Sequence, residues 1–247
     1  MQREKFIQLM DELLQPKGFK DHCHNGLQIE GRPEISKIVT SVSACQALID
    51  YAVEIDADAI ITHHGIIWND SSNVLTGFNY KRIASVIKHD INYFGYHLPL
   101  DNHPRLGNNR QLAEVLQIEV EGQSDEQEFL WYGKLVTPMV LSEFIEHYQE
   151  CTGHKPVFFG DKEKLITTIA WCTGGAQGML HDAIKLGVDC YISGEVSEYT
   201  MSVSDESGVA YVAGGHYVTE RYGIIALTEY LNEQGFDAEF LELYNPI

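Results

Sequence analysis

The sequence predicts an α/β protein made of two internally duplicated repeats, each with a mostly parallel, mixed sheet that is covered by helices. Three observations carry this prediction. Strand-like apolar runs alternate with helix-like amphipathic stretches, the same strand–helix–strand order occurs twice, and a polar stretch at residues 121–128 separates the two occurrences. We therefore expect one repeat at residues 1–124 and a second at residues 125–247.

Length and composition fit such a protein and exclude some partners. The chain has 247 residues, of which 44% are hydrophobic, so it can bury the core of one large domain or two small ones. Its 17 Lys and Arg against 36 Asp and Glu give a net charge of 17 − 36 = −19. Binding to a nucleic-acid backbone or to an anionic membrane is therefore not expected.

The cysteines and the N-terminal residues indicate the cytoplasm. There are five cysteines, an odd number without a C-x-x-C pair, which is typical of reduced thiols. The first residues are charged and lack an apolar stretch before a cleavage site, and no run of 18 apolar residues occurs.

The first repeat begins with a helix and continues with a parallel crossover. In residues 3–15 the apolar positions are three and four apart, which predicts an amphipathic helix that ends before Pro16. A strand at 35–42, a helix at 46–55 and a strand at 58–62 follow. This order requires a parallel crossover connection.

The second repeat has the same order 131 residues later, with strands at 169–173 and 189–193 around a helix at 177–186. At this offset Ile38 matches Ile169 and Asp58 matches Asp189. An offset of 119 sets three further residues against their counterparts: Gly95 against Gly214, His97 against His216, and Asp101 against Glu220. We interpret the chain as a diverged internal duplication.

The strand at 58–62 runs directly into His63-His64-Gly65. The carboxyl ends of parallel strands are where ligands gather, so this pair is the first candidate for metal ligation. Successive side chains of a strand point to opposite faces, which favours two ions with one imidazole each. The alternative is a structural histidine pair with hydrogen-bonded rings.

A second cluster follows an aromatic strand that begins at Asn92, in a loop that carries His97, Asp101 and His103. Loop ligands on a rigid sheet are a common arrangement in binding sites. Alternatively, Asp101 is a helix cap and His103 faces solvent, and we favour the latter interpretation for His103.

The third cluster is a buried strand, a glycine turn and a helix start at residues 211–221. If the helix begins near His216, then His216 and Glu220 project from the same face because they are four residues apart. Pairs with this spacing are also common on ordinary helix surfaces.

Together these clusters supply five nitrogen and oxygen ligands and no thiolate: His63, His64, Asp101, His216 and Glu220. Such a set suits two ions of zinc, manganese or iron that leave coordination positions open for water. Metal-activated water is a nucleophile, so the sequence predicts a hydrolase.

Three further motifs carry weaker signals. Residues 172–177 could hold a phosphate on backbone amides, although they lack a P-loop ending and tight packing explains them better. Glu195 follows a strand at the place that His63 and His64 take in the first repeat, and could be a supporting or catalytic acid. Residues 21–24 are interpreted as a solvent-exposed loop.

The chain resembles the GTP cyclohydrolase I type 2 homologues, also called NGG-interacting-factor-three-like proteins. The resemblance covers nearly the whole chain. It rests on motifs in this order: Asn25-Gly26-Leu27-Gln28, His63-His64-Gly65, His97-Leu98-Pro99-Leu100-Asp101, Gly107-Asn108-Asn109, Cys172-Thr173-Gly174-Gly175, Ser193-Gly194-Glu195, and Gly215-His216-Tyr217 with Thr219-Glu220.

The resemblance implies two intertwined α/β repeats, a metal site between them with two divalent ions, and ring-shaped homohexamers. Carried over by position, the ligands are the same five residues, with Glu220 able to contact both ions. His97 is expected beside the site as a supporting or acid–base residue. Ala176 replaces a third glycine of many relatives, which affects only the loop at 172–177.

The family name implies that water opens the imidazole ring of GTP. We expect a metal-dependent hydrolase that acts on a nucleotide-like or otherwise phosphorylated small molecule. The alternative is a non-catalytic metal-binding or scaffold protein whose ring stores ions or docks a protein partner. A purely structural adaptor would lose only stability when His63 and Asp101 are replaced.

Overall fold

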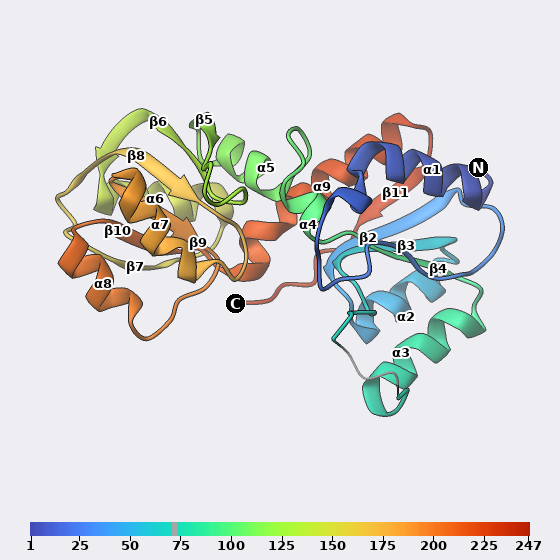
Figure 1. The fold of residues 1–247 in the computed structure, drawn as a ribbon. Coiled ribbons are helices and arrows are strands. Elements are labelled where there is room, and N and C mark those ends of the chain that lie inside the picture. The colour runs from blue at the N-terminus through green and yellow to red at the C-terminus, as the bar shows by residue number, and fades with distance from the viewer. Residues whose placement is uncertain (71–73) are drawn as a thin grey trace. The chain divides into compact units, whose positions relative to one another are not determined.

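The computed structural model describes residues 1–70 and 74–247 and divides the chain into two compact units. Unit 1 consists of residues 1–107 and 223–243, and unit 2 of residues 108–222 and 244–247. Both units are α/β layers (Figure 1).

Unit 1 is built on a five-stranded sheet in the order β1-β4-β3-β2-β11. Only the β1–β4 pair is antiparallel, so this sheet is mostly parallel, as predicted. Its elements are α1 (Arg3–Leu14), a 3-10 turn (Pro16–Gly18), β1 (Gly26–Ile29), β2 (Lys37–Ser43), α2 (Gln46–Glu54), β3 (Ala59–His64), α3 (Gly77–Lys88), β4 (Asn92–Gly95), α4 (Leu98–Asp101), the residues of α9 (His216–Glu233) from Gly223 on, and β11 (Asp237–Phe240).

Helices cover both faces of this sheet because alternate side chains of each buried strand point to opposite faces. Tyr93 of β4 belongs to a core cluster with Leu48 of α2 and Val86 of α3. Its neighbour Phe94 instead packs edge-on against Phe6 of α1, with ring centroids 5.2 Å apart. Figure 1 shows α2 and α3 on one side of the strands and α1 on the other.

Unit 2 is built on a six-stranded sheet in the order β5-β6-β8-β9-β10-β7. The β8–β9 and β9–β10 pairs are parallel and the other three are antiparallel, so this sheet is mixed but not mostly parallel. Its elements are α5 (Asn108–Val115), β5 (Ile118–Gln123), β6 (Trp131–Val140), α6 (Leu141–Thr152), β7 (Val157–Phe159), β8 (Leu165–Trp171), a 3-10 turn (Gln177–Met179), α7 (Leu180–Leu186), β9 (Cys190–Ser193), α8 (Thr200–Ser207), β10 (Ala210–Ala213) and the start of α9.

The unit 2 sheet also has a core on each face. Phe144 of α6 and Leu112 of α5 share one cluster with Trp171 of β8. Leu180 of α7 shares the other with Tyr191 of β9. The predicted mixed α/β architecture with helix-covered sheets is therefore confirmed in each unit.

The boundary expected near residue 124 lies inside unit 2. Residues 118–123 form β5, which pairs with β6 as an antiparallel hairpin, and Ser124 lies in the turn, where its N–H bonds to the carbonyl of Leu130. The chain returns to unit 1 near its C-terminus, since β11 pairs in parallel with β2. The compact units therefore differ from the two sequence repeats expected at residues 1–124 and 125–247. The division into these repeats stays a prediction.

The two parallel strand trios β2-β3-β4 and β8-β9-β10 correspond in register. Ile38 pairs with Ala59 in unit 1 and Ile169 with Cys190 in unit 2, and both residues differ by 131 (169 − 38 and 190 − 59). On the other side of these strands, Ala59 pairs with Asn92 and Cys190 pairs with Ala210. The two partners, Asn92 and Ala210, are 210 − 92 = 118 residues apart. The register of β4 and β10 thus gives an offset of 118, one residue less than the offset of 119 that matches His97 with His216 in the sequence.

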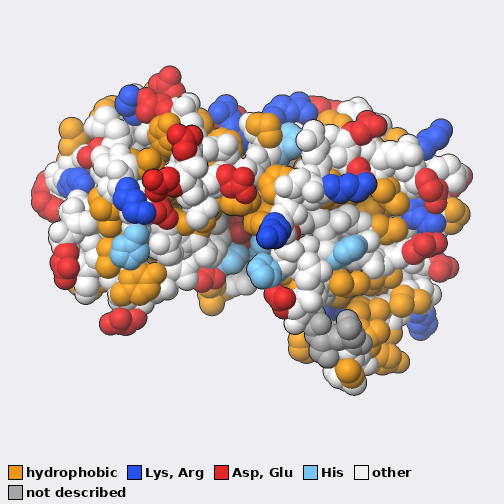
Figure 2. Space-filling model, viewed as in Figure 1, with side chains coloured by type: hydrophobic (Ala, Val, Ile, Leu, Met, Phe, Trp, Pro, Cys, Tyr) orange, Lys and Arg blue, Asp and Glu red, His pale blue; other side chains and the backbone are white. Residues whose placement is uncertain are grey.

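The surface agrees with the acidic composition. Acidic side chains are spread over the visible face, with basic ones between them (Figure 2). Among residues 1–70 and 74–247, no helix has both the length and the apolar character needed to cross a bilayer.

Candidate metal centre

His63 and His64 are the last two residues of β3 and their rings lie together. The ring centroids are 4.6 Å apart, with the planes tilted by 45°. The expected separation to opposite faces is therefore not observed. Strand geometry fixes the direction of each Cβ, but rotation about χ1 and χ2 can still bring two neighbouring imidazoles together at a strand end.

Each of these imidazoles is anchored through Nδ1. The Nδ1–H of His63 donates to the carbonyl oxygen of Tyr96 at 3.0 Å, and Nδ1 of His64 lies 3.1 Å from the Ser43 hydroxyl. The bond to a carbonyl leaves the lone pair of the neutral His63 ring on Nε2. This Nε2 lies 3.5 Å from Oδ1 of Asp101, the buried last residue of α4. Two electron-pair donors facing each other attract a cation between them.

His97 lies at the same place. Its ring centroid is 5.1 Å from that of His63 and 5.7 Å from that of His64. One ring nitrogen from each of the three histidines lies within 4.8 Å of the others. The backbone N–H of His97 donates to Oδ1 of Asn25 at 2.7 Å, which fixes the loop before α4.

Asp21 holds the His97 ring. The Nδ1–H of His97 donates to Oδ1 of Asp21 at 2.8 Å, and the same oxygen accepts the N–H of Cys23. Oδ2 accepts the side-chain amide of Asn25 and the N–H of Leu98. Burial by itself would raise the pKa of Asp21, but these hydrogen bonds hold it well below its usual range.

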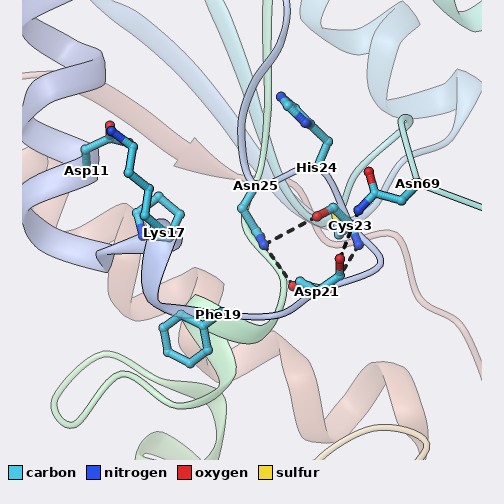
Figure 3. Close-up of a pocket in the computed structure, with 9 residues that line it drawn as sticks. Asp11, Lys17, Phe19, Asp21, Cys23, His24, Asn25 and Asn69 are labelled. Atoms are coloured by element: carbon cyan, nitrogen blue, oxygen red, sulfur yellow. Dashed lines mark hydrogen bonds between the residues drawn. The ribbon is translucent and has the colours of Figure 1, made fainter.

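The interpretation of residues 21–24 as an exposed loop is therefore wrong for Asp21, whose side chain is 2% exposed, and for Cys23, which is buried. It holds for His22, whose side chain is 79% exposed. Figure 3 shows Asn25 and Asn69 directed at Asp21. All three residues line a pocket of about 260 Å³. An Asp followed by polar turn residues gives no sign of the histidine it will contact 76 positions later.

Gln28 fixes the turn that follows His64. Its Oε1 accepts the N–H of Ile66 at 2.8 Å and of Ile67 at 3.0 Å, and its Nε2 donates to the carbonyl of His24. A Cβ at Gly65 would overlap this amide group, so any larger residue would displace the Gln28 side chain from these hydrogen bonds. The contacts give Asn25 and Gln28 of the Asn-Gly-Leu-Gln motif a structural role that their sequence pattern did not reveal.

Unit 2 carries a second cluster at the start of α9, which begins at His216 as predicted. His216 Nε2 lies 3.0 Å from Oε2 of Glu220, four residues later on the helix. Nδ1 lies 2.7 Å from Oε1 of Glu195, in the loop after β9. The ring is therefore held between two carboxylates.

These carboxylates decide the charge of His216. Burial lowers its pKa, but the hydrogen bonds with Glu220 and then Glu195 outweigh burial and raise the pKa to about 9. The surroundings of Nε2 thus favour a positive charge, which a proton or a metal ion can supply. A metal ion must displace the proton, because only the neutral imidazole coordinates.

The loop at residues 172–176 packs against this pair. The N–H of Thr173 donates to Oδ1 of Asn109, that of Gly174 to Thr219, and that of Ala176 to Ser193. These three amides are therefore engaged within the protein, which favours the packing interpretation over a phosphate-binding one.

His216 and Glu220 leave no room for a side chain at position 174. The φ of Gly174 is +69°, and a Cβ there would overlap Oε1 of Glu220 and lie 3.2 Å from Nε2 of His216. Only glycine leaves this space beside the two donor atoms.

The donor chemistry of both clusters fits divalent transition metals. The ligand atoms are imidazole nitrogens and carboxylate oxygens, and both His63 and His216 are anchored through Nδ1 by an acceptor of the same unit. This outer contact is usual for metal-ligating histidines because it fixes the tautomer and orientation of the ring. His103 is not part of either cluster, since its Nδ1 accepts the N–H groups of Arg105 and Leu106 in a local turn.

Comparisons with known proteins agree over nearly the full length. The model of the Duf34/NIF3 (NGG1p interacting factor 3) family matches residues 1–246. A GTP cyclohydrolase 1 type 2 homolog of Neisseria meningitidis serogroup A is 47% identical over 227 residues, which are 92% of this chain and 91% of the relative. The protein of the same name from Escherichia coli K12 is 42% identical over the full length of both chains. The chain also matches a solved structure described as protein ybgI, of unknown function. This match has a TM-score of 0.97 and 42% identity, and it covers 100% of each chain.

Proposed function

The chain belongs to the Duf34/NIF3 (NGG1p interacting factor 3) family, and from this premise we propose that it is a dinuclear metal-dependent hydrolase. The ligands of the two divalent ions are His63, His64 and Asp101 from unit 1 together with His216 and Glu220 from unit 2. One observation carries the proposal. In each unit a buried or half-buried histidine is anchored through Nδ1 while its Nε2 faces a carboxylate oxygen at 3.0 to 3.5 Å.

When bound, the ions would supply a coordinated water of lowered pKa and would polarise the bond to be broken. The protein residues prepare the two ligand sets. Glu195 orients the His216 ring by accepting its Nδ1–H, and Tyr96 does the same for His63 through its carbonyl oxygen. Glu220 would supply carboxylate oxygens as metal ligands beside His216.

The substrate is a nucleotide-like or otherwise phosphorylated small molecule. Relatives carry the name GTP cyclohydrolase 1 type 2 homolog, which points to GTP as the first compound to test. The net charge of −19 disfavours polyanions at long range, whereas bound dications reverse the field locally.

Assembly and location complete the proposal. The chain forms a ring-shaped homohexamer in the cytoplasm. Five free thiols agree with a reducing compartment.

The test begins with elemental analysis of protein purified without added metal. Wild type is compared with the double variant His64→Ala, Glu220→Ala, and both are screened for hydrolysis of GTP and other phosphorylated metabolites. About two ions per chain and turnover in the wild type, both lost in the variant, are the expected results.

Two other outcomes are informative. Two ions without turnover on any compound would favour a non-catalytic metal-binding or scaffold protein. A wild type that holds no metal even after reconstitution would contradict the metal centre itself.

A further inference from the structure

We propose that a pocket of unit 2 beside His216 binds a planar, nitrogen-containing aromatic ring of the substrate, and that His154 selects this ring through a hydrogen bond. The inference rests on the proposed function, in which the substrate is nucleotide-like, and deepens it. It assigns the ring of such a substrate to one pocket and names a specificity-determining residue that is not a metal ligand.

The pocket has a volume of about 320 Å³ and lies within unit 2. Glu195, which accepts the Nδ1–H of His216, is one of its lining residues, and so is Gly215, the residue before His216. A molecule bound in the pocket therefore lies next to the unit 2 cluster. Small-molecule sites measure about 300–1,000 Å³, so this pocket suits one ring system better than a whole nucleotide.

Apolar side chains form much of the pocket wall. Val157, Val196 and Ile247 line the pocket and are 52%, 40% and 67% exposed. Exposed apolar side chains that gather around one pocket are typical of a binding site, because a ligand removes their surface from water. An aromatic ring can bury its faces against such walls, whereas a charged group would lose its hydration there.

His154 brings a neutral imidazole to this pocket. Its backbone N–H donates to the Thr152 hydroxyl at 3.2 Å, which fixes the residue after the end of α6. Burial and then the charge of Arg221 lower the pKa of His154, so the ring is neutral at pH 7 and has one donor and one acceptor nitrogen. Among residues 1–70 and 74–247, neither ring nitrogen has a hydrogen-bond partner.

Gly215 keeps the space beside this imidazole open. Its φ is +92°, and a Cβ at this position would lie 3.1 Å from Nε2 of His154. Any larger residue would therefore crowd Nε2, whereas glycine leaves this nitrogen accessible to a ligand in the pocket.

Glu195 is the second polar group of the pocket. Its Oε1 accepts the Nδ1–H of His216 at 2.7 Å, whereas its Oε2 lies 3.4 Å from Nε2 of Gln177, which is long for a hydrogen bond. Oε2 can therefore accept a shorter hydrogen bond from an N–H of a ligand.

The polar groups favour a ring with N–H donors over a phosphate group. None of the described residues that line the pocket is Lys or Arg, so the pocket offers no cationic side chain to an anion. A carboxylate acceptor and a neutral imidazole between apolar walls match instead the edge and the faces of a nitrogen-containing aromatic ring.

The experiment measures binding and not turnover, with the full-length protein as purified. The probe is guanosine, which has an aromatic ring with N–H donors and no phosphate. Ribose 5-phosphate, which has a phosphate and no aromatic ring, is the comparison. Saturation-transfer NMR measures both dissociation constants, and elemental analysis measures the metal content of each protein.

Two variants change the pocket in different ways. His154→Ala should weaken guanosine binding about 10-fold, and His154→Gln should restore part of the affinity because its amide also donates and accepts. Val196→Asp places a charge on the apolar wall and should weaken guanosine binding about 10-fold. All three variants should leave the metal content and the binding of ribose 5-phosphate unchanged.

The matched control is His181→Ala, which removes an exposed histidine on α7 of the same unit, outside the pocket, and should bind guanosine as wild type does. Circular dichroism checks the fold of each variant. Because Val196 is 40% exposed, Val196→Asp tests the pocket even if His154→Ala fails to fold.

The outcomes separate this inference from the proposed function. Guanosine binding that His154→Ala and Val196→Asp leave unchanged would overturn the inference, while the metal centre and the hydrolase activity would stand. Equal weakening of guanosine and ribose 5-phosphate, or no saturable binding of guanosine to the wild type, would also overturn it. Guanosine binding that depends on His154 in a protein without turnover would support the inference and contradict the proposed hydrolase.

Discussion

Asp58 and Asp189 make the same pair of hydrogen bonds in the two units. Oδ2 of Asp58 accepts the N–H groups of Ser36 and Lys37 at 2.9 and 2.8 Å. Oδ2 of Asp189 accepts those of Thr167 and Thr168 at 3.0 and 2.9 Å. Donors and acceptor are each 131 residues apart, as the sequence offset predicts. The carboxylate at the entry of one strand thus caps the start of its neighbour in both sheets.

This contact leads to a stability prediction for Asp189. Burial raises its pKa, but hydrogen bonds from the Thr168 and Thr167 N–H groups, the Thr168 hydroxyl and the charge of Lys164 outweigh burial and lower the pKa. A carboxyl group with a lowered folded-state pKa stabilises the protein above its unfolded pKa, and this contribution disappears as the pH falls through the folded value.

We expect Asp189→Asn to reduce the free energy of unfolding by about 1–2 kcal/mol at pH 7. The difference from wild type should shrink below about pH 4, where the unfolded carboxyl group protonates. Urea unfolding of both proteins at several pH values measures this difference in the free energy of unfolding. Asp125→Asn, at an exposed loop position, serves as the matched control. A difference that does not shrink at all as the pH falls below about 4 would refute the assigned cause.

Gly174 should be intolerant of any side chain. Alanine there meets a left-handed φ of +69° and overlaps Oε1 of Glu220, so the ligand pair must move. We expect Gly174→Ala to lower the affinity of the unit 2 ligands for Zn²⁺ at least 10-fold, measured by metal titration in a His63→Ala, Asp101→Ala background.

Gly178→Ala is the control, because a Cβ at this position has nothing within 4 Å and the residue follows the same loop. Equal metal affinity of the two alanine variants would show that the space beside Glu220 does not matter.

Glu195 should act through His216. Glu195→Ala removes the acceptor of the His216 Nδ1–H, so the tautomer and orientation of the ring are no longer fixed. Metal affinity should fall about 10-fold to 100-fold, and Glu195→Gln should restore part of it because its amide oxygen still accepts the bond.

The measurement is competition for Zn²⁺ with a chelator of known affinity. Glu198→Ala changes an exposed acid three residues away and should have no effect. If Glu195→Ala binds Zn²⁺ as tightly as Glu198→Ala and wild type do, Glu195 does not act through His216. If both variants lose affinity equally, the contribution of Glu195 is merely electrostatic.

The parts of the fold with strong local signals were predictable. The helix at Arg3–Leu14 and the crossover from β2 through α2 to β3 follow from apolar spacing and from buried apolar runs. The hairpin of β5 and β6 was missed, because the polar residues of β5 lie on one exposed face and resemble a linker in sequence. Pairing of β11 with β2 was missed because it joins residues about 200 positions apart.

The candidate ligands show the same division. His63 and His64 end β3, Asp101 ends the short helix α4, and His216 and Glu220 lie at the start of α9. Local sequence reveals these positions. Their supporting residues Asp21, Gln28, Asn109 and Glu195 lie in loops or on other elements, and only Glu195 was anticipated, through the repeat.

The sequence by itself determined the α/β class, the two-fold recurrence of strand–helix–strand order and the residues that could bind metal, because these depend on local spacing and on residue chemistry. The tertiary structure alone decided that the His63 and His64 rings lie together, that Asp21 holds His97, and that the compact units divide at residues 107 and 223. These features depend on side-chain rotation and on contacts between residues far apart in the chain, which no local pattern encodes.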